Sequence, residues 1–199
     1  DNTALTMVTE DKGFIYGKVW GFIPADKKKQ KSKKEGVDYE RLIRQGSCFE
    51  CGGEVIDYGF IEAFIIGNEQ YKLKGIEEEY GVEIQQIGYD RYNAISTVQK
   101  LEAAGYECVE IKQHSSVLHM PTKLLKELVL NKKFRYEENL MLEINFQNSR
   151  CTEDTNLNKY VNKKKSAGKV DMVVSLINSI YLLQQDMLYG MSDFAVQVG

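Results

Sequence analysis

The chain has 199 residues, and its 43% hydrophobic and 28% charged residues suit one α/β domain with a real core rather than a largely disordered chain. The net charge of −3 and the pI of about 5.6 exclude a protein that is basic throughout, so DNA binding would require a local basic patch. No apolar run reaches the roughly 20 residues that span a bilayer and no signal peptide is evident, so we expect a reduced, cytosolic protein.

The first half of the chain begins with a predicted hairpin. Apolar runs predict strands over residues 3–9 and 13–23, and the turn residues between them predict an antiparallel pair. The sequence KKKQKSKKEG, Lys27 to Gly36, predicts a charged, solvated loop, with contact to a DNA backbone as the alternative. A short helix is expected over 38–45, and Asp57 is expected to cap a longer helix.

The second half predicts a parallel unit. Strands over 82–89 and 106–111 flank a helix over 94–104, and such short connections require a right-handed crossover between parallel strands. Beyond them we expect a helix from Pro121 to about Asn131, an extended segment over 134–146, a loop over 150–165 and a final helix from Val170 to about Tyr189. The predicted fold is α/β, a mixed sheet of an antiparallel hairpin plus parallel strands, flanked by helices on both faces.

Two common signatures are incomplete in this chain. Cys48 and Cys51 have CxxC spacing, but a zinc site needs two more ligands, and Cys108 and Cys151 do not repeat the spacing. We therefore expect ordinary reduced thiols. The sequence has no G-x-x-x-x-G-K-[ST] loop, so we expect no NTPase within this chain.

Two aspartates occupy positions that suit a metal site. Asp90 ends a predicted parallel strand, where sites form in α/β sheets, and Asp171 lies in the first turn of the last helix, with Ser175 and Asn178 on its face. If the two carboxylates meet, hard divalent cations between them would remove their repulsion and could activate water for attack on a phosphodiester. The alternatives are a turn residue at Asp90 and a favourable helix dipole at Asp171.

Several motifs together resemble the nuclease half of the tailed-phage terminase large subunit. They are WGFIP at 20–24, GEVIDYGFI at 53–61, GYDRYNA at 88–94, PTKLLKELVLNKKF at 121–134 followed by Asn148, and KKKSAGKVDMVVSLINSI at 163–180. The match covers nearly the whole chain in the order and spacing of the family. It implies an RNase H-like fold and a single nuclease domain over residues 1–199.

The resemblance also implies a function and its partners. Such domains cut concatemeric double-stranded viral DNA during packaging, with acidic residues that hold two Mg²⁺ or Mn²⁺ ions. Asp90 and Asp171 match two of the catalytic, metal-binding acids. The expected partners are double-stranded DNA, the terminase ATPase domain (absent here), the portal protein and the terminase small subunit, in the host cytoplasm of a phage or prophage.

One departure from the family concerns the first catalytic acid. In the family this aspartate lies on the first strand, a few residues ahead of a segment that matches DNTAL, residues 1–5 here. The resemblance therefore places the first strand and its acid ahead of Asp1. We expect the chain as given to bind metal weakly and to cut poorly.

Lysines cluster just ahead of Asp171. Lys163, Lys164, Lys165 and Lys169 could form a solvated loop, or they could neutralise phosphate charge and hold DNA without reading its sequence. Two other interpretations of the whole chain stay open. One is a catalytically silent docking module of the packaging motor, and the other is a different RNase H-like nuclease, such as a resolvase or an integrase.

Overall fold

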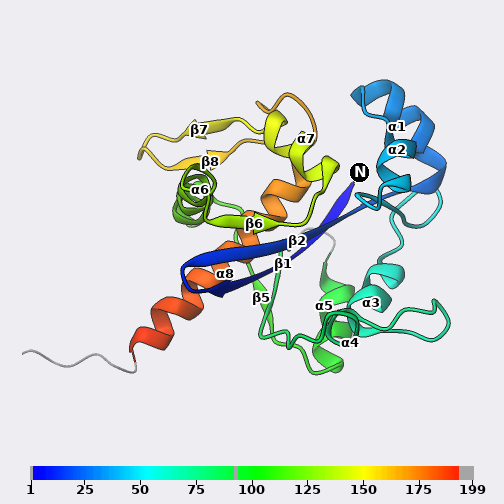
Figure 1. Cartoon of the computed structure of the whole chain (residues 1–199), viewed down its shortest axis with the longest axis horizontal. Helices are drawn as coiled ribbons and strands as arrows, with labels where there is room; N and C mark the ends of the chain where they lie inside the picture. Colours follow the sequence, from blue (N-terminus) through cyan, green and yellow to red (C-terminus); the bar gives the residue numbers. More distant parts are fainter. Residues whose placement is uncertain (1, 92–93, 193–199) are drawn as a thin grey trace, which may run out of the picture.

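The computed structural model describes residues 2–91 and 94–192; Asp1, Tyr92 and Asn93, which belong to the motifs above, lie outside the described residues. Its first feature is the predicted antiparallel hairpin, which is confirmed (Figure 1). Strand β1 (Thr3–Asp11) pairs with β2 (Phe14–Ile23), so that Thr3 lies opposite Phe22. Lys12 and Gly13 both adopt positive φ, 51° and 79°, which matches the twist that a two-residue hairpin turn requires.

In the described residues, the strands form two sheets and one two-stranded ribbon. In the first sheet β3 (Phe49–Glu50) and β6 (Phe134–Tyr136) both run parallel to β2. The second sheet pairs β4 (Ile87–Tyr89) with β5 (Cys108–Glu110) in parallel through helix α5 (Ile95–Ala103), as predicted. The antiparallel ribbon joins β7 (Cys151–Glu153) and β8 (Lys159–Val161).

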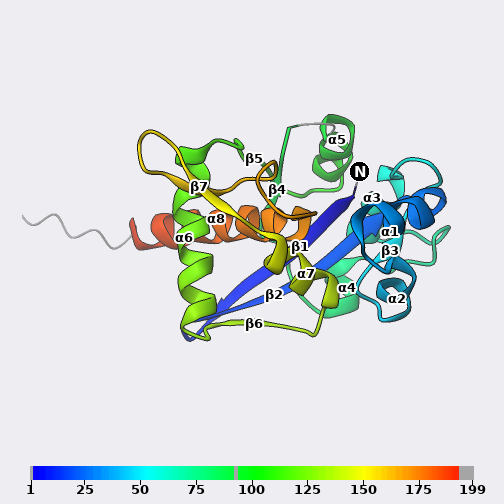
Figure 2. The same ribbon diagram turned by 90° about the horizontal axis from the view of Figure 1, so that it is seen from above.

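Helices cover both faces of the first sheet. Besides α5, the α-helices are α1 (Lys28–Glu35), α2 (Tyr39–Arg44), α3 (Tyr58–Ile66), α4 (Ile76–Tyr80), α6 (Ser115–Leu130), α7 (Leu140–Asn148) and α8 (Asp171–Ser192). Odd-numbered residues of β2, among them Ile15 and Val19, join the core under α6, α7 and α8. Even-numbered residues, among them Trp20 and Phe22, join a second core with α3, α4 and α5. This alternation confirms the predicted helices on both faces of the sheet, which Figure 1 shows, and Figure 2 shows α6 crossing α8, on which it packs.

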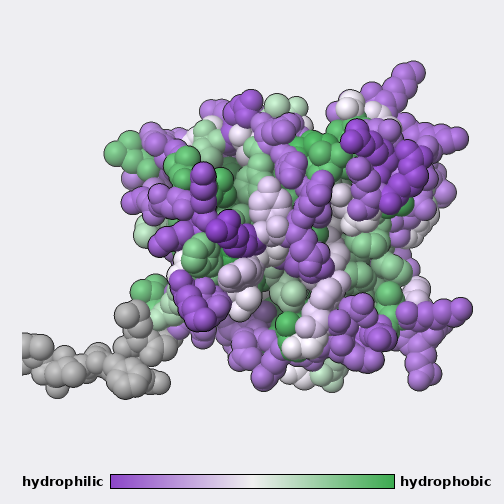
Figure 3. Space-filling view, in the orientation of Figure 1, coloured by the Kyte–Doolittle hydropathy of each residue, from purple (hydrophilic) through white to green (hydrophobic). Residues whose placement is uncertain are grey.

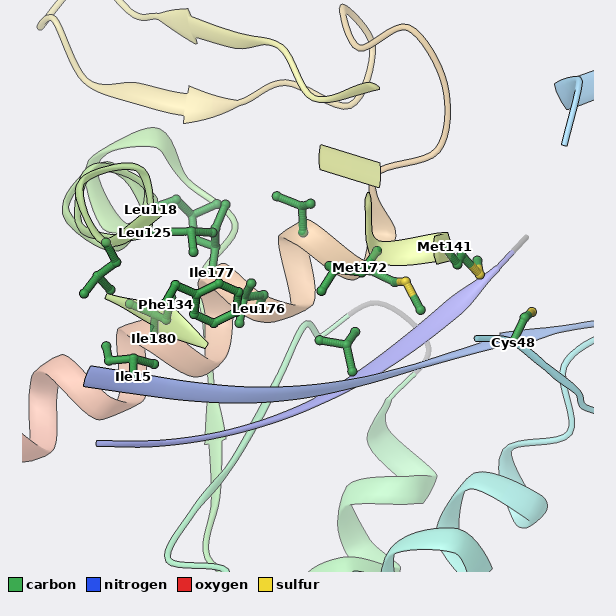
Figure 4. Close-up of a cluster of buried hydrophobic side chains, with 14 of the residues drawn as sticks. Ile15, Cys48, Leu118, Leu125, Phe134, Met141, Met172, Leu176, Ile177 and Ile180 are labelled. Atoms are coloured by element: carbon green, nitrogen blue, oxygen red, sulfur yellow. The ribbon is translucent and has the colours of Figure 1, made fainter. Parts of the chain in front are cut away.

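The larger core fixes the last helix in place. Leu176, Ile177 and Ile180 of α8 are fully or almost fully buried. Figure 4 shows them between Leu118 and Leu125 of α6 on one side and Ile15 of β2 with Phe134 of β6 on the other. The first turns of α8 are therefore held rigidly against the sheet.

The predicted loop over Lys27 to Gly36 is wrong, because the segment is helical. A short 3₁₀ turn (Ala25–Lys27) leads into α1, which ends at Gly36 with φ 66°. Lysine, glutamine and glutamate are good helix formers, and an ion pair one turn apart between Lys31 and Glu35 supports the helix. No α1 side chain is buried, and Figure 3 shows a strongly hydrophilic surface over α1.

Three further boundaries differ from the predictions. Helix α6 starts at Ser115 rather than at Pro121, since the proline costs one helix hydrogen bond while the apolar face is buried on both sides of it. The predicted extended segment over 134–146 is mostly helix α7, because the Asn139 side chain accepts a hydrogen bond from Leu142 N at 3.0 Å and caps it. Strand β4 begins at Ile87 rather than at Val82.

The predicted loop over 150–165 contains the β7–β8 ribbon. Asp154 Oδ1 accepts hydrogen bonds from the backbone of Asn156 (2.8 Å) and Asn158 (2.9 Å), and Leu157 adopts φ 64°, which together close the turn. Short polar strands of this kind have no apolar alternation that a sequence pattern could reveal. No described helix combines the length and hydrophobicity required of a transmembrane segment.

Candidate active site

The site lies in a cleft of about 1980 Å³ between the two sheets. Residues 2–10 along β1 line one side, and residues 85–90, which include β4, line the other. Helix α8 contributes a third wall from Asp171 to Met187, and it packs against both β1 and β4. Both predicted catalytic aspartates, Asp90 and Asp171, line this cleft.

Two asparagines of α7, the buried Asn145 and the partly buried Asn148, position Asp171. Asn145 of α7 accepts a hydrogen bond at Oδ1 from Met172 N (3.1 Å) and donates one from Nδ2 to Met141 O (2.8 Å). It thereby satisfies one of the backbone N–H groups that the start of α8 leaves without a helical partner. Asn148 donates to Lys169 O at 3.1 Å, and a Cβ at Gly168 would come within 2.7 Å of its Nδ2. The segment that leads into α8 is therefore closely packed on α7.

The Asp171 carboxylate is only partly compensated. Lys163 Nζ lies 3.5 Å from its Oδ1, and 22% of the side chain is exposed. Within residues 2–91 and 94–192, Oδ2 has no hydrogen-bond partner although it is buried. A buried carboxylate oxygen without a donor is costly, and a cation that approached from the cleft would relieve this cost.

The position of Asp90 in the cleft follows from the direction of the second sheet. Gly88 packs against Leu182 of α8, and beyond the end of β5 Gln113 donates a hydrogen bond to Asn178 at 3.2 Å. The parallel strands β4 and β5 therefore run in the direction from Leu182 toward the N-terminal end of α8, where Asp171 lies. Asp90 follows β4 directly and is exposed. It therefore lies at the carboxyl end of the second sheet, which is directed toward the N-terminal end of α8.

The predicted polar face of α8 links this helix to both sheets. Ser175 Oγ accepts a hydrogen bond from Thr6 Oγ1 at 2.9 Å, and Ser179 Oγ donates to Thr6 O at 3.2 Å. Asn178 receives the bond from Gln113. These hydrogen bonds fix the positions of β1 and of the chain beyond β5 along the axis of α8.

The structure separates the four predicted lysines. Lys163 and Lys169 line the cleft, whereas Lys164 and Lys165 are exposed outside its lining. Asn162 Oδ1 accepts hydrogen bonds from Lys164 N (3.0 Å) and Lys165 N (3.2 Å), so the lysines follow β8 in a defined turn. They form a basic rim beside the Asp171 end of the cleft.

The donor set fits hard divalent cations in kind and is incomplete in number. Carboxylate oxygens are the ligands that Mg²⁺ and Mn²⁺ prefer, and the unpaired Oδ2 of Asp171 offers one. Over the described ranges, no group of three or more His, Cys, Asp or Glu side chains could hold a metal. Asp90 and Asp171 would therefore need further oxygen donors to complete a site.

The CxxC pair lies in the interior. Cys48 and Cys51 are both buried, and Cys51 Sγ donates to Asp57 O at 3.2 Å. Burial raises the pKa of Cys48 to about 12 and also raises the pKa of Cys51. Both groups remain neutral thiols at pH 7 in this environment. Asp57 caps α3 as predicted, accepting from Gly59 N at 2.9 Å.

The sequence interpretation missed Glu62, a buried carboxylate of α3. Its exposed fraction is 6%, and it accepts hydrogen bonds from Thr97 Oγ1 (2.9 Å) and Lys100 Nζ (2.6 Å) of α5. Helix α5 begins shortly after Asp90, so these bonds hold the segment that carries Asp90. A glutamate on the apolar face of α3 was the available signal.

We expect Glu62→Gln to lower the free energy of unfolding by about 1 kcal/mol, because it weakens two hydrogen bonds to a charged acceptor while Lys100 stays largely exposed. Urea denaturation would measure the change. Glu102→Gln, on the exposed side of α5, is the matched control and should stay within about 0.5 kcal/mol of the wild type. Equal effects of the two substitutions would contradict a role for Glu62 in anchoring α5.

Comparison with known proteins identifies the family and the fold of the chain. The family described as "Terminase large subunit, endonuclease domain" matches residues 1–186. The crystal structure of the HK97 bacteriophage large terminase superposes with a TM-score of 0.78 at 21% sequence identity. That match covers 92% of this chain and 36% of the HK97 chain, so the present chain spans about a third of its length. No curated protein sequence matches the chain significantly.

The structural similarity confirms the predicted RNase H-like α/β fold. The family match extends over nearly all described residues and includes both aspartates and the lysine rim. This chain therefore belongs to the family of terminase large-subunit endonuclease domains.

Proposed function

We propose that the chain is a metal-dependent endonuclease domain that cuts concatemeric double-stranded viral DNA during packaging. The observation that carries the proposal is the convergence of Asp90 and Asp171 on one cleft, with a buried oxygen of Asp171 that lacks a donor among the described residues. Asp90 and Asp171 are 81 positions apart in the sequence, and the fold places both on the wall of this cleft. Their mutual repulsion favours a cationic ligand between them.

Asp90 and Asp171 would hold Mg²⁺ or Mn²⁺ ions, two in the proposed mechanism. Such ions, when bound, activate a water for attack on phosphorus and stabilise the leaving oxygen. The protein's own part is to fix the acids. Asn145 holds the start of α8, and the hydrogen bonds of Glu62 hold α5 behind Asp90. Lys163 lies near Asp171 and would neutralise part of the charge when no DNA is present.

The lysine rim would hold the DNA backbone. Lys163 and Lys169 line the cleft, and Lys164 and Lys165 extend the positive surface outward from it. Lysine ammonium groups bind phosphates as point charges and read no sequence. In the complete terminase, the ATPase domain, the portal protein and the small subunit would supply the substrate and its timing.

A plasmid-nicking assay with Mn²⁺ tests the function. We expect slow conversion of supercoiled to open-circular DNA that stops when EDTA removes the metal. Mn²⁺ binding should be measurable by calorimetry in the absence of DNA. Cleavage that continues in EDTA would overturn the metal-dependent mechanism, and binding without any cleavage would favour a catalytically silent docking module. A strong preference for four-way junctions would instead indicate a resolvase.

Replacing Lys163, Lys164 and Lys165 with alanine should weaken DNA binding and flatten its salt dependence. The slope of log K against log salt should fall by about 0.9 for each phosphate contact that is lost. Fluorescence anisotropy with a labelled duplex over a range of NaCl concentrations measures this slope. The matched control replaces three exposed lysines of α1, Lys29, Lys33 and Lys34, by alanine. A larger change in this slope for the α1 variant would indicate that DNA contacts α1 rather than the lysine rim.

A further inference from the structure

Asn2, which directly precedes β1, carries a buried amide oxygen that lacks a hydrogen-bond donor. The residue is 8% exposed and lines the cleft. Within residues 2–91 and 94–192, its Oδ1 has no hydrogen-bond partner, and the same is true of Oδ2 of Asp171. A buried oxygen without a donor costs free energy, so a ligand that approached from the cleft would stabilise each of these atoms.

The contact between β1 and α8 places Asn2 at the level of Asp171. Two hydrogen bonds define how the strand lies along the helix, from Ser175 Oγ to Ala4 O (3.4 Å) and from Ser179 Oγ to Thr6 O (3.2 Å). Two strand residues therefore correspond to four helix residues, about 7 Å along the strand and about 6 Å along the helix. The next such step toward the start of both elements pairs Asn2 with Asp171.

The direction of the side chains agrees with this pairing. Thr6 Oγ1 donates to Ser175 Oγ at 2.9 Å, so the side chain of Thr6 points toward α8. Side chains alternate along a strand, and Asn2, four residues earlier, therefore points to the same side. Both Asn2 and Asp171 line the cleft. Their two unpaired oxygens are thus placed at the same end of one cavity.

Hydrogen bonds fix the orientation of the Asn2 amide. Asn2 Nδ2 donates to Tyr39 Oη at 3.0 Å, and Tyr39 Oη donates to Glu35 Oε2 at 2.5 Å. Burial opposes the ionisation of Glu35, but hydrogen bonds from Tyr39 and Lys31 and the charge of Lys169 lower the pKa of this carboxyl. A hydroxyl has one proton, and Glu35 accepts it, so Tyr39 can only accept from the amide nitrogen. Oδ1 of Asn2 is therefore turned away from Tyr39.

An amide oxygen beside a carboxylate suits a hard divalent cation. Mg²⁺ and Mn²⁺ prefer oxygen ligands, and Mg²⁺ sites usually combine one or two carboxylates with several waters. Asp90 and Asp171 need further oxygen donors to complete a site. Asn2 would supply one without adding to the repulsion between the two carboxylates.

We propose that Asn2 is a further metal ligand of the candidate site through Oδ1, and that Tyr39 is the positioning residue that orients its amide. The inference rests on the proposed function, because Asp171 has to hold the same ion. It adds a neutral ligand to a site that was predicted from acidic residues alone. The cation would thereby also contact β1, so that metal binding links this strand to the start of α8.

Calorimetry with Mn²⁺ on the full chain, without DNA, tests the assignment. Asn2→Leu keeps the approximate size of the side chain and removes its oxygen, so Mn²⁺ should bind about tenfold more weakly. Tyr39→Phe keeps Oδ1 but removes the hydroxyl that orients it, and it should cause a smaller loss of affinity. Asn131→Leu, at an exposed asparagine beyond the end of α6, is the matched control and should bind Mn²⁺ like the wild type.

Asn2→Asp distinguishes a ligand from a side chain that is only structural. In EDTA the added carboxylate lies near Asp171 and should lower the melting temperature. In Mn²⁺ it becomes a charged ligand, so the affinity should rise about tenfold, and Mn²⁺ should raise the melting temperature more than it does for the wild type. A structural role alone would lower the melting temperature equally with and without the metal.

NMR on the wild-type chain gives a measurement that needs no substitution. Saturating Mg²⁺ should shift the resonance of the Asn2 side-chain carbonyl carbon, because the ion polarises the oxygen bonded to it. No such shift, unchanged Mn²⁺ affinity of Asn2→Leu, or equal destabilisation of Asn2→Asp with and without Mn²⁺ would each overturn the assignment.

Asp171→Asn, measured in parallel, separates this inference from the proposed function. If Mn²⁺ affinity falls in Asp171→Asn but not in Asn2→Leu, the metal site stands and the assignment of Asn2 is wrong. If the affinity falls in neither variant, the metal site itself is wrong and the assignment fails with it.

Discussion

Replacing Asp171 with asparagine is expected to reduce Mn²⁺-dependent nicking on the order of a thousandfold, the effect of losing several kcal/mol of metal-derived stabilisation of the transition state. Asparagine keeps the size of the side chain and the start of α8, but it removes the negative charge. Asparagine has no equivalent of the carboxylate Oδ2 of Asp171, which is buried beside the cleft and has no hydrogen-bond partner among the described residues. Affinity for Mn²⁺ in calorimetry should fall in parallel, at least tenfold.

Two companion variants make this result interpretable. Asp90→Asn should cause a comparable loss, because both carboxylates line the same cleft. Asp11→Asn, at the exposed end of β1 outside the cleft, should cut and bind metal like the wild type. Circular dichroism would verify that each variant is folded. Wild-type nicking by Asp90→Asn and Asp171→Asn together would end the catalytic assignment.

Asn145→Ala should have the second largest effect, because it acts on stability and on the site together. The substitution leaves Met172 N without its buried acceptor, at a cost of about 1–3 kcal/mol in the free energy of unfolding. The start of α8 would also lose the contact that fixes Asp171. We therefore expect Mn²⁺ affinity to fall under conditions in which the variant is still fully folded.

Chemical denaturation and calorimetry measure the two parts of this prediction separately. Asn131→Ala is the matched control, since Asn131 is an exposed asparagine just beyond the end of α6. It should change the free energy of unfolding by no more than about 0.5 kcal/mol. A stability loss at Asn145 with unaltered Mn²⁺ affinity would show that α8 keeps its position without this side chain.

Local signals explain which elements could be predicted. The hairpin, the cap at Asp57 and the unit around α5 each rest on residues within a few positions of one another, namely turn residues, a capping side chain or a terminal glycine. Helix α1 was not predicted, because a run of lysines is also typical of a solvated loop, although the same residues are good helix formers. The β7–β8 ribbon failed because its turn depends on Asp154, and no apolar pattern marks its strands.

The candidate site divides in the same way. Asp90 and Asp171 could be chosen as candidates because each lies at a strand or helix end, and the family motifs strengthened the choice. Asn145 and Glu62 could not be found from local patterns, since their partners lie 27 and 35 or more positions away in the sequence. Nor could the sequence reveal that Lys163 and Lys169 face the cleft while Lys164 and Lys165 do not, because this depends on the turn at Asn162.

The way α8 serves both sheets has a consequence for tuning the site. No hydrogen-bonded ladder connects β1 with β4 in the described residues. The distance between Asp171 and Asp90 is therefore set by the side chains through which both sheets pack on α8. The distance between packed elements changes gradually with the volume of the side chains between them, whereas the register of a hydrogen-bonded ladder can change only by whole residues. Adding or removing a single methylene where Leu182 meets Gly88 would thus adjust the separation of the two acids in fine steps.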